Sequence, residues 1–125
     1  NIKEIKSSGD KRINFKIKNN LIFRSSQTNT INLIIDLQTT KEKKVKEKNI
    51  KNEITKYKIL ARTNVKLRFY EKGLDDEFII TSSQDYLVDV NTTNNLQNER
   101  NALENIANEL SKKIRTRILL ILNDL

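Results

Sequence analysis

The sequence contains no cysteine and no histidine, and its only glycines are Gly9 and Gly73. Without Cys or His, the chain has no thiol nucleophile, no Ser-His-Asp triad, and no zinc or haem site of the common kinds. Two isolated glycines do not make a Gly-rich loop that cradles a phosphate. The longest apolar run, residues 118–122, is far shorter than the ~20 residues of a membrane-spanning helix. These absences favour a protein without catalytic activity, cofactor or metal ion.

The charge balance is basic, because 24 Lys and Arg residues stand against 16 Asp and Glu residues and give a formal net charge of +8. A basic surface attracts polyanions such as nucleic acid, an acidic membrane surface or a phosphorylated glycolipid. Lys, Asn and Ile are all abundant, as AT-rich codon usage would also produce, so charge alone does not choose a partner. The length of 125 residues and the 36% hydrophobic content predict one domain with a thin core.

A stretch of strict alternation, residues 55–69, organises the predicted fold. Every even position except Leu60 is polar, whereas most odd positions are apolar. A period of two predicts a long, half-buried strand with one dry face and one wet, basic face. Residues 71–73 then predict a hairpin turn. The dry face of the following strand is predicted to carry Phe78, Ile80, Ser82, Tyr86, Val88 and Val90.

Two other segments are predicted to join this sheet, namely a short strand at residues 1–6 and a strand at residues 30–40. Residues 25–29 between the first helix and the second strand are polar and loop-like. Residues 41–51 form the most charged segment of the chain. We interpret this segment as a solvated hairpin tip with Asn49 near the turn, and the alternative is a basic finger that contacts an anion.

A first amphipathic helix is predicted within residues 9–24. Ile13, Ile17 and Leu21 recur there every four residues, Phe15 and Ile22 flank this stripe, and Ser8 is a candidate N-cap.

A second, longer helix is predicted near residues 95–122, where apolar residues step at three or four positions from Leu96 to Leu125. Asn94 and Gln97 have the spacing of a capping box. At about 1.5 Å per residue, this helix is about 42 Å long and can cover the long hairpin. Leucines at 119, 120 and 122 widen its apolar stripe. Burial under the sheet edge, fraying of the helix end and a patch for a partner all remain open as explanations.

The predicted order is strand, helix, three antiparallel strands, helix. This is an α+β fold, with a four-stranded mixed sheet and both helices on one face. Asp75, Asp76 and Glu77 could form a metal or acid-base site, but turn residues in water are the simpler interpretation. A free polar sheet face favours a binding protein over an enzyme. The basic residues predicted on that face are Lys56, Lys58, Arg62, Lys66 and Arg68.

Short motifs along nearly the whole chain have a familiar order. They are residues 5–14 (IKSSGDKRIN), 55–57 (TKY), 83–86 (SQDY), 99–102 (ERNA) and 106–110 (IANEL). In this combination, the chain resembles the LptE lipoproteins of alphaproteobacterial type. The resemblance implies a single LptE-like domain over residues 1–125, downstream of a lipidated N-terminal Cys.

The resemblance also implies a function and partners. LptE-like proteins are lipid-anchored at the periplasmic face of the outer membrane, plug an LptD-type β-barrel, assist its assembly and help lipopolysaccharide reach the outer leaflet. The implied partners are therefore that barrel, lipopolysaccharide and the outer membrane, with no nucleic acid. Some members contact lipopolysaccharide through basic residues near the strand tips. The lysines in the corresponding segment are Lys43, Lys46, Lys48 and Lys51.

A second function remains possible from the sequence, because helix, three strands and helix on a basic chain also outline a double-stranded RNA-binding domain. Against this alternative, the predicted strands are too long and residues 94–97 at the start of the last helix are neutral. Aromatic residues are also too few to form a stacking platform.

Overall fold

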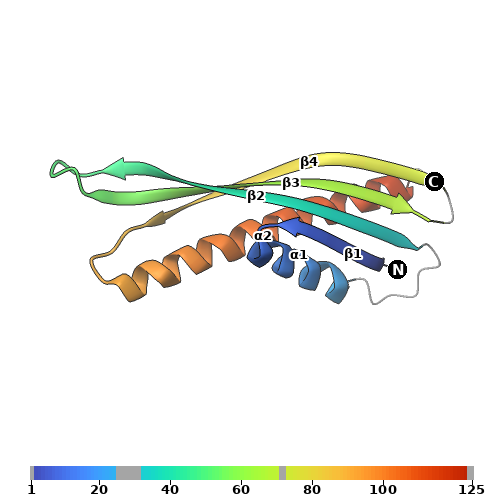
Figure 1. Cartoon of the computed structure of the whole chain (residues 1–125), viewed down its shortest axis with the longest axis horizontal. Helices are drawn as coiled ribbons and strands as arrows, with labels where there is room; N and C mark the ends of the chain where they lie inside the picture. Colours follow the sequence, from blue (N-terminus) through green and yellow to red (C-terminus); the bar gives the residue numbers. More distant parts are fainter. Residues whose placement is uncertain (1, 25–31, 71–72, 124–125) are drawn as a thin grey trace.

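A computed structural model describes residues 2–24, 32–70 and 73–123 (Figure 1). These residues form one four-stranded sheet, with β1 parallel to β2 and the other neighbouring pairs antiparallel. The predicted α+β class, element order and mixed sheet are confirmed. The segment predicted as a loop at 25–29, part of the turn at 71–73, and Leu125 lie outside the described residues. The elements are β1 (Ile2–Gly9), α1 (Lys11–Arg24), β2 (Leu33–Lys48), β3 (Ile54–Phe69), β4 (Leu74–Leu87) and α2 (Thr92–Asn123).

Both helices cover the same face of the sheet (Figure 1). Burial alternates along β3, because odd-numbered residues from Ile59 to Phe69 are buried whereas Arg62, Lys66 and Arg68 are exposed. The apolar stripes of the two helices close the core against the buried side. The predicted dry face of residues 55–69 and the buried stripes of both helices are therefore confirmed in their central parts. On β4, Ser82 and Tyr86 of the predicted dry face are buried. The largest fully buried side chains include Ile13, Ile17, Leu21, Ile35, Leu37, Leu67, Phe69, Ile106, Leu110 and Ile114.

The second strand is longer than its hydrophobic pattern predicts, because β2 continues past Thr40 to Lys48. The charged second half of β2 pairs with β3 along its full length, with shifts in the strand register near Glu47. Residues 41–48 are therefore strand and not tip, which corrects the prediction, although all of them are exposed to solvent as predicted. Asn49 does lie in the turn as predicted, since its Oδ1 accepts hydrogen bonds from the backbone N–H groups of Lys51 and Glu53 at 2.9 and 3.0 Å.

The predicted N-cap of α1 is wrong, because Ser8 belongs to β1 and Asp10 caps the helix. The Asp10 carboxylate accepts a hydrogen bond from the backbone N–H of Ile13 at 2.9 Å. Asp10 is also the residue at which the chain leaves the sheet, because its N–H donates to the Thr39 carbonyl at 2.9 Å. Gly9 permits this exit, with a φ of 88° and no Cβ to collide with the Thr39 carbonyl.

The long helix also begins earlier than predicted. Asn91 caps α2, because its Oδ1 accepts from the N–H of Thr93 at 3.0 Å. Asn94 and Gln97 lie inside the first turns, where their side chains bond to Asp89 and Asn101 instead of forming a capping box. No helix within residues 2–24, 32–70 and 73–123 is long and apolar enough to span a membrane.

Several apolar residues of the predicted stripes lie outside the core. Phe15 on α1 is 62% exposed, and Leu96 near the start of α2 is 58% exposed. Leu119 and Leu120 are well exposed on an intact helix, so fraying does not explain them. Val90 lies beyond the end of β4 and is fully exposed.

Candidate functional site

The open face of the sheet carries the basic column predicted on β3, but the face as a whole is not basic. Carboxylates lie beside some of these cations in register: Lys66 lies between Asp36 on β2 and Glu77 on β4, whereas the β2 neighbour of Lys58 is Lys44. Beyond Asp36, the next neighbour is Lys6 on β1. The wet face of β3 is basic as expected, but strand register brings a carboxylate beside most of its cations, so the sheet face as a whole is not basic.

Ion pairs hold several members of this column. Arg68 Nε lies 3.3 Å from the Asp75 carboxylate, and Lys56 Nζ lies 3.6 Å from Glu47. Lys58 pairs in register with Asp85, and Arg62 lies between Thr40 and Thr81. All these side chains are at least partly open to solvent. The face is therefore a polar surface rich in donors and acceptors, with little net charge.

The four lysines predicted to contact lipopolysaccharide do not form one cluster. By alternation, Lys43 lies on the helix side of β2, whereas Lys46 forms an ion pair with Asp85 on the open face. Lys48 ends β2, and Lys51 lies in the turn. Only Lys48 and Lys51 lie at the exposed tip, on either side of the fully exposed Ile50 in the sequence. The turn projects beyond the start of α2 (Figure 1).

Lys43 instead occupies an aromatic site under the sheet. Its ammonium lies 4.4 Å from the centre of the Tyr57 ring, 5.6 Å from that of Tyr86 and 3.3 Å from the Glu99 carboxylate of α2. A hydrogen bond with the Tyr86 side chain is the main cause that raises the pKa of Lys43, and Glu99 adds to it, although partial burial acts in the opposite direction. This lysine therefore ties the hairpin to α2.

The acidic cluster beside the β3–β4 turn is used in contacts on both faces. Asp75 pairs with Arg68 on the open face, whereas Asp76 faces the helices and lies 3.0 Å from Arg117 Nε. Glu77 accepts a hydrogen bond from the Asn64 amide at 3.2 Å. These partners give each carboxylate a role in joining strands or in joining the sheet to α2.

The positive charge of the protein is concentrated on its helices. In α1, five residues are Lys or Arg and none is acidic, whereas α2 has five basic and three acidic residues. The helices thus hold a formal net charge of +7, out of +8 for the whole chain. The absence of acidic residues from residues 11–24 is the sequence signal that could have revealed this asymmetry.

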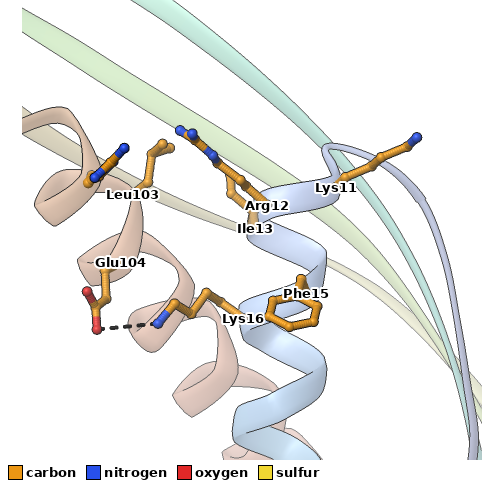
Figure 2. A pocket seen from close by; sticks show the side chains of 8 residues that line it. Lys11, Arg12, Ile13, Phe15, Lys16, Leu103 and Glu104 are labelled. Carbon is orange, nitrogen blue, oxygen red and sulfur yellow. Dashed lines mark ion pairs between the residues drawn. The ribbon is translucent and has the colours of Figure 1, made fainter. Parts of the chain in front are cut away.

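A groove of about 590 Å³ lies where α1 begins beside α2 (Figure 2). The two helices run side by side in the same direction, since Lys16 pairs with Glu104 at 3.6 Å and Asn20 bonds to Asn108 at 3.0 Å. Sequence periodicity places the buried faces of the helices but not their exposed flanks, so it does not predict the groove. Its lining residues are Lys11, Arg12, Ile13, Phe15, Lys16, Arg100, Leu103 and Glu104.

Solved structures of bacterial lipoproteins have the same architecture. Rare lipoprotein B from Shewanella oneidensis is 16% identical, with a TM-score of 0.56 and coverage of 97% of this chain and 94% of its own. A lipoprotein from Caulobacter crescentus is 12% identical, with a TM-score of 0.63 and coverage of 96% and 90%. This chain has a lipoprotein fold. No protein-family model and no curated protein sequence matches it.

The shared lipoprotein fold includes the sheet and both helices. A minor lipoprotein from Acinetobacter baumannii is 13% identical, covers 92% of this chain with 94% of its own, and has a TM-score of 0.50. Because these alignments span nearly the whole chain, the open face and the groove are built from elements of the common lipoprotein fold rather than from an insertion.

Proposed function

We propose that this chain is a non-enzymatic, LptE-type component of the outer-membrane lipopolysaccharide translocon. In this role it plugs an LptD-type β-barrel, assists the assembly of that barrel and contacts lipopolysaccharide, while lipid-anchored at the periplasmic face of the outer membrane. The ordered motifs from residues 5–14 to 106–110 support this function. The fold similarity to rare lipoprotein B is consistent with it, since that protein is a bacterial lipoprotein of the same architecture.

The observation that carries the proposal is the open face of the sheet. The lumen of an outer-membrane barrel is polar, so a protein that fills it needs surfaces that hydrogen-bond over a large area. The open face offers charged groups of both signs, amides and hydroxyl groups along strands of up to 16 residues, with a few apolar side chains such as Ile79 among them. With its charges already balanced, this face can meet a polar wall without burying a large excess of one sign.

The tip of the β2–β3 hairpin suits contact with lipopolysaccharide. Lys48 and Lys51 have no ion-pair partner among the described residues, and Ile50 between them is fully exposed. A phosphorylated glycolipid with acyl chains offers anionic oxygens to the lysines and an apolar surface to the isoleucine. The other predicted lysines, Lys43 and Lys46, already have carboxylate partners within the protein.

Co-expression with the LptD-type barrel of the same genome tests the proposal. A photo-crosslinking residue replaces Ser83, which is exposed on the open face, and the barrel carries the affinity tag. We expect the chain to co-purify with this barrel, and not with a porin tagged in the same way, and to crosslink to lumen-facing positions. Failure to co-purify, together with tight binding to duplex RNA in a gel shift at ~150 mM salt, would favour the nucleic-acid function instead.

A further inference from the structure

The groove between α1 and α2 lies on the side of the molecule away from the open face. We infer that it binds an acidic segment of the host barrel, and that a bulky apolar side chain of this segment fills the groove. The identity of the host rests on the proposed function. The chemistry of the segment rests on the groove itself, which combines an apolar floor with a cationic rim.

The floor of the groove is apolar and well supported. Ile13 and Leu103 are buried at its base, where they belong to the main core. Phe15 stands at the side of the groove with 62% of its surface exposed, and Figure 2 shows its ring facing outward from α1. An aromatic side chain beside a concave apolar surface is a typical anchor point in protein–protein interfaces.

The rim of the groove has an excess of cations. Lys11, Arg12 and Arg100 have no carboxylate partner within residues 2–24, 32–70 and 73–123. The rim's one carboxylate, Glu104, already pairs with Lys16 (Figure 2). Carboxylates of a bound segment can therefore approach three free cations without displacing an internal ion pair.

The walls of the groove are held in place before any partner binds. At the start of α1, the Asn14 amide donates to the Ser8 carbonyl at 2.8 Å, and Asp10 N–H donates to Thr39. Further along, the Asn20 amide bonds to Asn108 at 3.0 Å and to the Ser111 hydroxyl at 3.2 Å, which joins the two helices. Pre-organised walls reduce the entropy lost on binding, as a docking site requires.

A protein segment fits this groove better than a lipid. The groove is partly open to solvent, so a long acyl chain laid in it would keep part of its surface in water, whereas one side chain could be covered. The cations also come from two helices, with Lys11 and Arg12 on α1 and Arg100 on α2. This distribution matches several separate carboxylates rather than a single headgroup.

The test places a photo-crosslinking residue at position 15 in the full-length protein, co-expressed with the barrel. We expect a crosslink to a barrel peptide rich in Asp and Glu, identified by mass spectrometry. The double substitution Arg12→Glu and Arg100→Glu should lower the crosslinking yield about tenfold, since it reverses two rim charges. The matched control, Lys18→Glu with Lys112→Glu, changes the same charge on the same helices outside the groove and should leave the yield unchanged.

The crosslinker at Ser83 separates this inference from the proposed function. If Ser83 crosslinks to the barrel and position 15 does not, the groove inference is wrong and the plug function stands. A crosslink from position 15 to lipopolysaccharide or phospholipid would likewise overturn the acidic segment. If neither position crosslinks to the barrel, both the plug function and the groove inference fail.

Discussion

The hydroxyl of Thr39 donates a hydrogen bond to Oδ1 of Asn14 at 2.7 Å, and both side chains are almost completely buried. The Thr39 oxygen also lies 2.9 Å from the Thr63 hydroxyl, and the Asn14 amide donates to the Ser8 carbonyl. This network joins α1 to β1, β2 and β3 within an otherwise apolar core. Because buried polar groups must stay paired, the network specifies a single position for the first turn of α1 and therefore for one wall of the groove.

Substitution of Asn14 by Leu should destabilise the protein by about 2–4 kcal/mol, because it leaves the Ser8 carbonyl without its donor and removes an acceptor from Thr39. Urea denaturation measures this difference in the free energy of unfolding. The control is Asn19→Leu on the exposed side of the same helix, which should change stability by less than about 0.5 kcal/mol. Equal stabilities of the two variants would show that the network contributes nothing specific.

Substitution by alanine should lower the free energy of unfolding by different amounts at the two glycines. Gly9 and Gly73 both have a positive φ, of 88° and 59°, so alanine is strained at either position. At Gly73 an added Cβ would meet no atom, and we expect a loss of about 1–2 kcal/mol in the free energy of unfolding. At Gly9 the Cβ would collide with the backbone carbonyl of Thr39, so the loss should be larger by at least about 1 kcal/mol. Thermal unfolding of the two variants would contradict this account if Gly73→Ala were the less stable.

Hydrophobic periodicity locates the core of this protein because each element buries one face. The four-residue spacing of Ile13, Ile17 and Leu21 predicts the buried stripe of α1, and the alternation along residues 55–69 predicts the buried face of β3. Helix starts are less predictable, because a cap depends on where the preceding backbone leaves the sheet. Ser8 and Asp10 are both suitable N-cap residues by type. Asp10 is the N-cap in the structure because the chain leaves the sheet there, where its N–H donates to the Thr39 carbonyl.

The candidate surfaces depend on strand register and helix pairing, which one-dimensional patterns do not contain. From the sequence alone, Lys66 is predicted to belong to a basic face. The strand register places Asp36 and Glu77 beside it. The sequence predicts that Lys43 lies in the hairpin tip, because charged residues have a low strand propensity. In the structure, pairing with β3 places Lys43 in β2, on the helix side of the sheet. The groove requires the parallel contact of α1 with α2, for which the sequence has no signal beyond the basic composition of α1.

The site of Lys43 predicts a pH dependence of stability. The pKa of Lys43 is raised above 10.5, chiefly by its hydrogen bond with Tyr86 and also by Glu99, so the charged form stabilises the fold. This contribution is fully present below the unfolded pKa near 10.5 and is lost as the pH rises through the higher folded-state value. Because the side chain is well exposed and solvent screens it, Lys43→Met should cost less than about 1 kcal/mol at pH 7.

Urea denaturation between pH 7 and about 11.5 measures this dependence. The difference in stability between the wild type and Lys43→Met should shrink above pH 10.5. Lys43→Arg is the control, because the guanidinium group keeps its charge over this pH range. The Lys43→Arg variant should therefore remain more stable than Lys43→Met, by the same free energy of unfolding, at every pH. If the difference in the free energy of unfolding between the wild type and Lys43→Met stayed constant to the highest pH, packing of the side chain, and not its charge, would stabilise this site.

The hairpin tip predicts a local effect on lipopolysaccharide binding. Lys48→Glu with Lys51→Glu should weaken binding at least about fivefold at ~150 mM salt, since both free cations at the tip become anions. Fluorescence titration with purified lipopolysaccharide measures the affinity. At higher salt, the difference in affinity between the wild type and the variant should become smaller. Neither lysine side chain takes part in an ion pair among the described residues, so the free energy of unfolding should change little.

The matched control for the tip is again Lys18→Glu with Lys112→Glu, which alters the net charge equally on the helix side. If general attraction between a basic protein and a polyanion dominated, both pairs of substitutions would weaken binding to the same extent. A loss confined to the tip pair requires close contact between phosphate groups and Lys48 or Lys51, because screening removes the effect of charges more than about 8 Å away at physiological salt. Replacing Ile50 by Ser should then reduce the affinity further, since only a molecule already held at the tip can cover that fully exposed side chain.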